Sequence, residues 1–215
     1  MTADNPLAST ARQSAVSDLK KAYILDAARA VFEREGFQAA SMRQIARAAG
    51  YTTGAIYFYF ESKEALYGAL LDQSLDRLCA ATGGAAAAAD GPLAAFRAAA
   101  FAFFSFYLEN PRDLDLGFYL NQGGLEPRGL GEARDRELNA KLLRALSPLT
   151  QAFAEIGLSP TVAETETARF FAYASGVLLL HHTARLRLFP VDAETLVAQY
   201  VDYVSDRLTR RVRAG

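Results

Sequence analysis

The chain has 215 residues, of which 51% are hydrophobic and 22% charged. This balance is ordinary for a protein that buries a core, and it excludes long disordered regions. A net charge of −1 and a pI near 6.2 exclude a uniformly basic nucleic-acid-binding protein. The single cysteine, Cys79, excludes an intramolecular disulfide. Residues 1–17 lack the apolar run of a signal peptide, so we expect a cytoplasmic protein.

Helical periodicity runs along most of the chain, and no segment shows the alternating pattern of a strand. We therefore predict an all-α fold in two domains. Residues 1–17 form a polar, disordered tail, residues 18–80 the first domain and residues 81–215 the second. The predicted helices span residues 18–35, 42–49, 53–59, 62–80, 93–109, 112–120, 131–156, 161–188 and 193–211.

Start and stop signals set these bounds. Gly36 is a natural C-cap for the first helix, and Ser41 with Gln44 has the form of a capping box at the start of the second. Gly50 ends that helix. The glycine pair at 83–84 and the Asp-Gly-Pro sequence at 90–92 are helix breakers, so the domain boundary is predicted between the fourth and fifth helices.

Two short helices joined by a tight glycine turn, residues 42–49 and 53–59, have the dimensions of a helix-turn-helix that enters the major groove of DNA. Residues 36–60 contain no Asp or Glu but include Arg43 and Arg47. A surface that approaches phosphates needs such a gap, because like charges oppose binding. Any three-helix bundle contains similar helix pairs, so the pattern alone leaves an ordinary core open.

The same segment resembles a known family. Residues 24–37 (ILDAARAVFEREGF) are similar to the first helix of the tetracycline-repressor (TetR) family, and residues 41–50 (SMRQIARAAG) to its second. Residues 51–66 (YTTGAIYFYFESKEAL) are similar to its recognition helix and the start of its fourth helix. The resemblance covers residues 20–71 without gaps. It implies a three-helix DNA-binding domain followed by a helical domain for ligand binding and dimerisation.

Matching positions in the family imply roles for individual residues of this chain. Arg43 matches a position that reads a guanine, and Gly54 one where the recognition helix comes close to DNA. The implied DNA-contacting residues are Ser41, Arg43, Thr52, Thr53, Gly54, Tyr57, Phe58, Tyr59 and Lys63. Tyr51, Thr53, Phe58 and Tyr59 depart from the residues that are common at their positions, which leaves base preference open.

Aromatic residues are dense in the second domain, where they either fill the core or line a ligand cavity. We expect a hydrophobic or aromatic small-molecule effector, with no cofactor, and take Tyr107, Tyr119 or His181 as polar anchors. The candidate pocket residues are Phe103, Phe104, Tyr107, Phe118, Tyr119, Phe153, Phe171 and His181.

Enzymatic and metal-dependent functions find little support. His181 and His182 point about 100° apart on a helix, and no carboxylate or cysteine stands beside them at a ligand spacing. There is no HExxH sequence and no phosphate-binding GxxxxGK loop. We expect no catalytic and no metal site. A helical metabolite carrier or enzyme without DNA binding remains an alternative.

The last two long helices, residues 161–188 and 193–211, form the dimer interface in the resembled family. Small residues at Ala172, Ala174, Ser175 and Gly176 would allow a partner helix to approach closely. A two-fold dimer would present two recognition helices to a palindromic DNA operator. We therefore expect a homodimeric repressor that an apolar ligand releases from its operator, with an activator or a corepressor-dependent regulator as the alternative.

Overall fold

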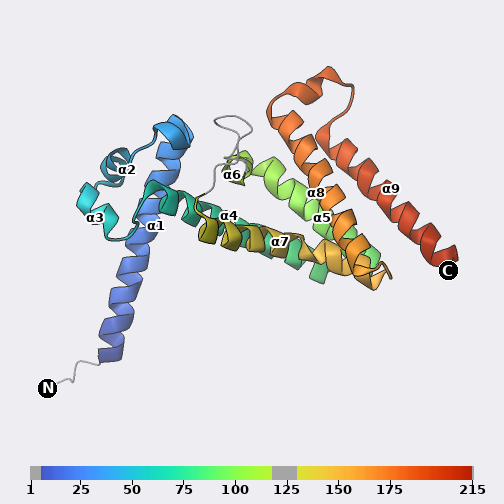
Figure 1. Ribbon diagram of the computed structural model, residues 1–215, viewed down its shortest axis with the longest axis horizontal. Helices are drawn as coiled ribbons and strands as arrows, with labels where there is room; N and C mark the ends of the chain where they lie inside the picture. Colours follow the sequence, from blue (N-terminus) through green and yellow to red (C-terminus); the bar gives the residue numbers. More distant parts are fainter. Residues whose placement is uncertain (1–5, 118–129, 215) are drawn as a thin grey trace. The chain divides into compact units, whose positions relative to one another are not determined.

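The computed structural model describes residues 6–117 and 130–214. In these ranges the regular elements are α-helices and one short 3-10 helix, with no strand, which confirms the all-α fold (Figure 1). None of the described helices is both long and apolar enough to cross a membrane. The elements are α1 (Pro6–Ala39), α2 (Met42–Ala49), α3 (Thr53–Tyr57), α4 (Lys63–Ala87), α5 (Pro92–Glu109), α6 (Pro111–Gly117), α7 (Glu132–Glu155), α8 (Pro160–His182), η2 (Arg185–Leu188) and α9 (Ala193–Ala214).

The chain divides into two compact units, and the division falls inside α4 between Leu71 and Asp72. The first unit, here called the head, holds α1, α2, α3 and the start of α4, with the described part of residues 116–135. The second, here called the bundle, holds residues 72–115 and the chain from Arg136 onward. The expected boundary after residue 80 lies instead within a continuous helix.

Helix α4 continues through the glycine pair at 83–84, where the sequence predicts a break. Each glycine lowers helix stability by about 1 kcal/mol relative to alanine. The flanking alanines have the highest helix propensity of any residue. Thr82 adds a buried hydroxyl that lies 3.1 Å from the Leu78 carbonyl oxygen and 2.8 Å from that of Ala145 on α7. Local propensity and this interhelical contact together account for the longer helix.

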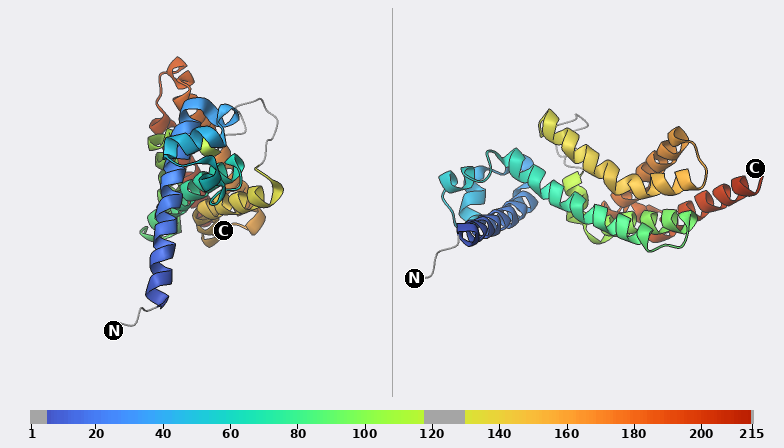
Figure 2. Two further views of the ribbon diagram at one scale, coloured as in Figure 1. Left: turned by 90° about the vertical axis from the view of Figure 1, so that its left-hand side faces the viewer. Right: turned by 90° about the horizontal axis from the view of Figure 1, so that it is seen from below.

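The core of the head forms where α1 packs against α2, with α3 beside them (Figure 2). Ile24, Ala28 and Val31 of α1 are fully buried, as are Ile45 and Ile56 of the two short helices. An aromatic cluster closes one side, with the ring of Tyr67 edge-on to those of Phe32 and Phe37 at 5.3 and 4.9 Å. The periodic apolar residues of the sequence therefore do form this core.

Helix α1 is longer than predicted at both ends. It begins at Pro6, so residues 6–17 are helical where the sequence predicts a disordered tail; residues 1–5 lie outside the described ranges. The side chains from Arg12 to Tyr23 are exposed, apart from a half-buried Ser17. The polar composition of this segment therefore reflects a helix whose side chains are exposed to solvent. Gly36, the predicted C-cap, does interrupt the helix with φ 75°, before one more turn.

The bundle has an aromatic core. Phe96, Phe103, Phe153 and Phe170 are almost completely inaccessible to solvent. The ring of Phe96 lies 4.8 Å from that of Phe153, and the ring of Phe103 lies 5.7 Å from that of Phe170. These contacts join α5 to α7 and α8, and α9 packs against α5 and α8.

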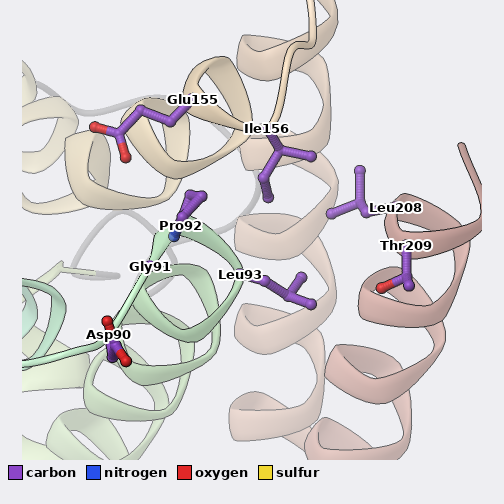
Figure 3. Close-up of a pocket in the computed structure, with 8 residues that line it drawn as sticks. All are labelled: Asp90, Gly91, Pro92, Leu93, Glu155, Ile156, Leu208 and Thr209. Atoms are coloured by element: carbon purple, nitrogen blue, oxygen red, sulfur yellow. The ribbon is translucent and has the colours of Figure 1, made fainter. Parts of the chain in front are cut away.

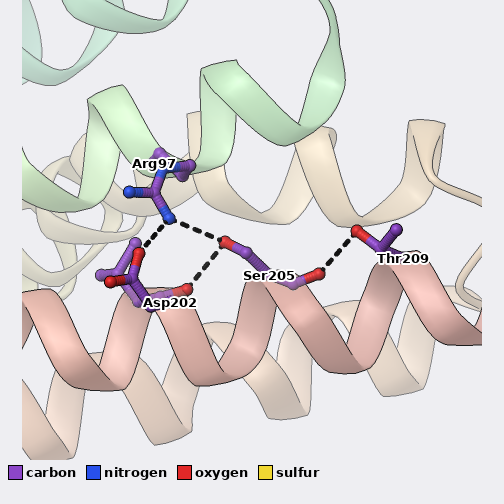
Figure 4. A network of polar contacts seen from close by, with 5 residues as sticks. Arg97, Asp202, Ser205 and Thr209 are labelled. Atoms are coloured by element: carbon purple, nitrogen blue, oxygen red, sulfur yellow. Dashed lines mark hydrogen bonds and ion pairs between the residues drawn. The ribbon is translucent and has the colours of Figure 1, made fainter.

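Polar contacts fix the helices of the bundle to one another. On α5, the Arg97 guanidinium donates to the Asp202 carboxylate at 2.5 Å and the Ser205 hydroxyl at 3.3 Å, both on α9 (Figure 4). On α7, the Lys141 ammonium lies 2.5 Å from the Asp72 carboxylate and 2.8 Å from that of Asp76, both on α4.

Two predicted helices end earlier than their sequences suggest. The helix predicted over residues 161–188 stops at His182, because Ala184 takes a left-handed conformation (φ 59°) that α-helices exclude, and η2 follows. The helix predicted over residues 53–59 ends at Tyr57. Of the helix predicted over residues 112–120, the last three residues lie outside the described part.

The Lys63 side chain, at the start of α4, connects α4 to the end of α1. Its ammonium group donates to the backbone carbonyls of Phe37, Gln38 and Ala40 at 3.0, 3.2 and 3.3 Å. The same nitrogen lies 4.7 Å from the centre of the Phe37 ring. An ammonium has three protons, and all three are used on carbonyls that the end of α1 leaves exposed.

Replacing Lys63 with methionine keeps an unbranched side chain, one heavy atom shorter, but leaves these carbonyls without a donor. We expect Lys63→Met to lower the free energy of unfolding by about 1–3 kcal/mol, the usual range for losing hydrogen bonds from a charged group. Urea denaturation followed by circular dichroism measures the change. Lys21→Met, on an exposed side chain, is the control. Unchanged stability would show that the contacts contribute nothing to the fold.

Candidate nucleic-acid interface

The start of α2 is capped as the sequence predicts. The Ser41 hydroxyl accepts a hydrogen bond from the Gln44 amide at 3.3 Å and lies 2.6 Å from the Gln44 side-chain oxygen. The cap differs from the standard box, in which the Gln side chain reaches the Ser backbone amide. Ser41 is exposed, so its hydroxyl serves the helix and also lies at the surface.

The turn between α2 and α3 is tight because Gly50 adopts φ 71°, a left-handed conformation that glycine takes without strain. The Tyr51 amide then donates to the Ala46 carbonyl at 2.9 Å. Thr52 caps α3 by accepting from the Ala55 amide at 3.2 Å. Only three residues separate the two helices, which fixes their mutual angle as a helix-turn-helix requires.

The helix pair has a buried face and an exposed face. Ile45, Ala46, Ala49 and Ile56 point into the head, and all are almost fully buried. The exposed residues are Ser41, Arg43, Arg47, Thr52, Gly54, Tyr57 and Phe58. Thr53 and Tyr59 are half-buried. The structure therefore places most of the predicted DNA-contacting residues on one short segment at the surface.

Tyr57 and Phe58 are unusual for a surface. Their side chains are 52% and 83% exposed, although burying either would be favourable. The Phe58 ring contacts the edge of the Tyr59 ring at 5.1 Å between centroids. Exposed aromatic rings on this segment can contact thymine methyl groups, and its exposed arginines can contact phosphates and guanine edges.

Lys63 differs from its expected role. The resemblance implies a phosphate contact, but the structure directs its ammonium protons to the backbone carbonyls at the end of α1. The side chain is half-buried. The sequence gives no sign that Lys63 has this structural role, because the carbonyls that it binds lie 23 to 26 residues away in the chain.

The predicted pocket residues of the bundle fall into three groups. Phe103, Tyr107 and Phe171 lie together, with the Phe103 ring 5.2 Å from that of Tyr107 and 5.9 Å from that of Phe171. Phe104 and Phe153 are buried, and Phe153 contacts Phe96 instead. His181 is exposed, and Phe118 and Tyr119 lie outside the described residues.

Tyr107 is the best placed of the proposed polar anchors. Burial raises the pKa of its phenol, and the Asp113 carboxylate raises it further, so the hydroxyl keeps its proton at neutral pH. The ring nitrogen Nε2 of His182, and not of His181, lies 3.1 Å from the Tyr107 carbonyl oxygen. Both histidines are exposed, and the sequence does not show which of the two contacts the Tyr107 backbone.

Sequence reasoning missed one buried hydroxyl. The Ser74 side chain on α4 is fully buried, and among the described residues its oxygen is the buried side-chain polar atom without a hydrogen-bond partner. Such an atom calls for an explanation, because leaving it unpaired costs about 1–3 kcal/mol. A lone serine in a helix gives no signal in the sequence.

Two hollows in the bundle are lined by none of the residues that the sequence analysis predicts as pocket residues. One, of about 460 Å³, is lined by Asp90, Gly91, Pro92, Leu93, Glu155, Ile156, Leu208 and Thr209. The other, of about 670 Å³, is lined by Glu166, Arg169, Ala172, Tyr173, Tyr200, Tyr203, Val204 and Arg207.

Metal-binding and thiol chemistry have no visible site in the part of the chain that the structure describes. It contains no group of three or more His, Cys, Asp or Glu side chains that could hold a metal ion. Burial raises the pKa of the Cys79 thiol, and its sulfur lies 3.6 Å from the Lys141 carbonyl oxygen. A raised pKa keeps the thiol protonated, which makes it a poor nucleophile.

Comparison with known proteins points to the same segment. Residues 24–70 match the family described as bacterial regulatory proteins, tetR family. The transcriptional regulator RutR of Escherichia coli is 49% identical over 65 residues, which are 30% of this chain and 30% of RutR. YfiR of Bacillus subtilis, an uncharacterized transcriptional regulator, is 36% identical over 59 residues, 27% of this chain and 29% of YfiR. The matched stretch thus spans less than a third of these relatives.

Solved structures extend the likeness to the bundle. A protein of unknown function from Rhodococcus sp. RHA1 has a TM-score of 0.69 and 26% identity, covering 87% of this chain and 94% of that one. FadR of Bacillus subtilis, solved with stearoyl-CoA, has a TM-score of 0.65 at 18% identity, covering 86% and 96%. The latter likeness shows a shared fold. Residues 24–70 thus match the tetR family of bacterial regulatory proteins, and beyond them the likeness is one of fold.

Proposed function

We propose that this protein is a sequence-specific DNA-binding transcription regulator whose affinity for its operator is controlled by a small apolar ligand. The observation that carries the proposal is the exposed face of α2 and α3. There Arg43, Tyr57 and Phe58 lie at the surface of a rigid helix pair, within the segment that matches the tetR family.

The chemistry of this face suits DNA. Arginine recognises guanine through two parallel hydrogen bonds, and tyrosine hydroxyls donate to phosphate oxygens. Gly54 has no side chain to hold α3 away from the groove, and residues 36–60 contain no carboxylate to repel phosphates. Ser41 and Thr52 present their cap hydroxyls at the same surface. Lys63 contributes by fixing the position of α1 against α4.

The bundle is proposed to hold the ligand. The buried Ser74 hydroxyl without a protein partner supports this, as does the neutral, buried Tyr107 beside Phe103 and Phe171. The likeness of fold to FadR, solved with stearoyl-CoA, supports an apolar ligand of substantial size. Helix α4 begins in the head and ends in the bundle, so a ligand that shifts α4 would act on both.

The sign of regulation is proposed as repression, relieved by the ligand. An activator or a corepressor-dependent regulator would use the same DNA-binding face and the same ligand-binding bundle. In either case the ligand and the operator must change each other's affinity by the same factor, because binding free energies are linked. Couplings of about 1–3 kcal/mol are typical.

A homodimer is proposed to form through α8 and α9, which lie side by side in the bundle (Figure 1). Ala172 and Gly176 are exposed one turn apart on α8, and Tyr203 of α9 is 65% exposed. Near them, the buried Glu166 carboxylate lies 2.6 Å from both the Arg169 and the Arg207 guanidinium groups. Tyrosine and arginine are enriched at interface cores, and small residues let a partner helix approach closely.

Arg43→Ala tests the DNA-reading surface. We expect a loss of about 1–3 kcal/mol in operator binding and relaxed selectivity at one base pair, because a bidentate contact to guanine would be removed. Fluorescence anisotropy on an operator duplex and its single-base variants measures both effects. The duplex is taken from the DNA that flanks the protein's own gene.

The matched control is Arg185→Ala, which removes an exposed arginine from η2 in the bundle. It should leave binding unchanged. If Arg43→Ala weakened binding equally for every base variant, Arg43 would contact the backbone only. If the intact protein bound the operator no better than a random duplex over a range of salt concentrations, the proposed sequence-specific function at that site would be rejected.

Gly176→Arg tests the proposed interface. In the isolated chain a Cβ atom at Gly176 meets nothing within 4 Å, so the arginine is compatible with the fold of one protomer. We expect a shift from dimer to monomer in light scattering and at least about a tenfold loss of operator affinity. Ala140→Arg, at an exposed position of α7, is the control. A dimer that persisted in Gly176→Arg would place the interface elsewhere.

A further inference from the structure

The larger hollow of the bundle is lined entirely by residues of α8 and α9. Its volume of about 670 Å³ falls in the range of small-molecule sites. The smaller hollow has a different character, because there the side chains of Leu93, Ile156 and Leu208 point toward one another (Figure 3). Tyrosine and arginine side chains make up most of the larger one, and none of the predicted pocket residues lines it. It is therefore a separate candidate site.

A buried carboxylate holds two arginines in the lining of this hollow. Glu166 on α8 is 5% exposed. One of its oxygens lies 2.6 Å from the Arg169 guanidinium, and the other lies 2.6 Å from that of Arg207 on α9. Burying a charged carboxylate is costly unless it is paired, and here one carboxylate has two cationic partners. The pairing therefore fixes the positions of both guanidinium groups before a ligand binds.

Positive charge is in excess around the hollow. Its lining contains Arg169 and Arg207 but only one acidic residue, Glu166. The carboxylate of Asp202 on α9 is bound by an arginine of α5 (Figure 4), and within the described residues no second carboxylate pairs with either lining arginine. Residues 211–215 are Arg, Val, Arg, Ala and Gly, which add no acidic side chain. The hollow is therefore suited to an anion.

Hydrogen-bond donors also exceed acceptors in this lining. A guanidinium has five N–H donors in one plane, and Glu166 contacts one nitrogen of each arginine. The Tyr200 phenol adds a hydroxyl. Burial raises its pKa and the Glu166 carboxylate raises it further, whereas the two arginines lower it, and the pKa remains above its usual value. The hydroxyl thus keeps its proton at neutral pH. A carboxylate fits such donors, because its two oxygens accept parallel hydrogen bonds from a guanidinium.

Aromatic rings stand beside these donors. The rings of Tyr173 and Tyr200 are stacked, with 4.3 Å between their centroids and 15° between their planes. The Tyr173 hydroxyl donates to the Leu196 carbonyl at 3.1 Å, which holds the pair in place. Tyr203, one turn further along α9, is 65% exposed. Aromatic pairs stabilise a contact beyond the area that they bury, so a ligand with a flat ring would gain from this side.

We propose that this hollow binds a small aromatic carboxylate, whose oxygens accept from Arg169 and Arg207 and whose ring lies on the tyrosines. All lining residues belong to one protomer, so the site depends neither on the proposed DNA binding nor on the proposed homodimer. In a homodimer formed through α8 and α9, the bound carboxylate would supply the counter-charge that the arginines need when a second copy covers them.

Three probes with one ring system and different charges test the proposal. We choose 2-naphthoate, 2-naphthalenemethanol and 2-naphthylmethylammonium, each titrated into the full-length protein. The anisotropy of their naphthalene fluorescence reports binding. We expect 2-naphthoate to bind about tenfold more tightly than the neutral alcohol, because only the anion forms charge-assisted hydrogen bonds with the arginines. The cation should bind most weakly.

Lysine variants test the arginines without leaving the buried Glu166 unpaired. Arg169→Lys and Arg207→Lys keep the charge but remove the planar pair of donors. Each should weaken 2-naphthoate binding about three- to tenfold and leave the affinity for the alcohol unchanged. Arg185→Lys, at an exposed position of η2, is the matched control and should change neither affinity. The triple variant Glu166→Gln, Arg169→Gln, Arg207→Gln, checked for folding by circular dichroism, should lose the preference for the anion.

Tyr203→Ser tests the aromatic side of the hollow. Because the side chain is exposed, its removal should leave the fold intact. We expect about threefold weaker binding of 2-naphthoate and of the alcohol alike, since both lose the same ring contact. The matched control is Tyr23→Ser, which removes a 63% exposed tyrosine from α1 and should change neither affinity.

Several results would overturn the proposal. Equal affinity for 2-naphthoate and the alcohol would show that the hollow does not select a carboxylate. Unchanged 2-naphthoate affinity in both lysine variants would place the bound probe elsewhere. No binding of any probe would leave the hollow without this function. If the triple variant then also lost its dimer in light scattering, the arginines would serve contact with a second copy of the chain instead.

Discussion

The head depends on one set of hydrogen bonds, which the Lys63 ammonium donates to the backbone carbonyls of Phe37, Gln38 and Ala40. The end of α1 leaves carbonyl groups without partners, and a single cation from the start of α4 satisfies three of them. This contact fixes α1 against α4 and thereby the support on which α2 packs. The exposed face of α2 and α3 can remain free for a ligand because the stabilising contacts of the head lie behind it.

The bundle is held in a different way, by aromatic packing with charged contacts at its surface. Lys141 joins α7 to α4 through Asp72 and Asp76, and Arg77 donates to the Asp113 carboxylate of α6 at 2.5 Å. All of these contacts involve the part of α4 that follows Leu71. A single helix therefore takes part in the packing of both units, which is the physical basis for proposing that a ligand in one affects the other.

Two kinds of interior surface occur in the bundle, and they suit different molecules. Around Phe103 and Tyr107 the surface is aromatic, with a neutral hydroxyl. The hollow beside Leu208 has aliphatic side chains in its lining, and Thr209 is a polar residue among them. Selectivity in such sites arises less from apolar area, which any hydrophobic ligand can use, than from the few polar groups that must be matched on desolvation. The position of those groups decides which ligand class is accepted.

The sequence alone determined the helix-turn-helix, because its signals are local: Ser41 caps α2, Gly50 makes the turn, and Ile45 and Ile56 face inward at helical spacing. Residue order and the spacing of breakers also predicted most helices of the bundle. Tertiary structure decided what depends on distant partners. Lys63 contacts carbonyls more than twenty residues away, α4 continues past Gly83 while Thr82 contacts α7, and residues of α5, α7 and α9 line one hollow. Helical periodicity fixes which side of a helix is apolar, but only packing decides which residues of different helices share a cavity.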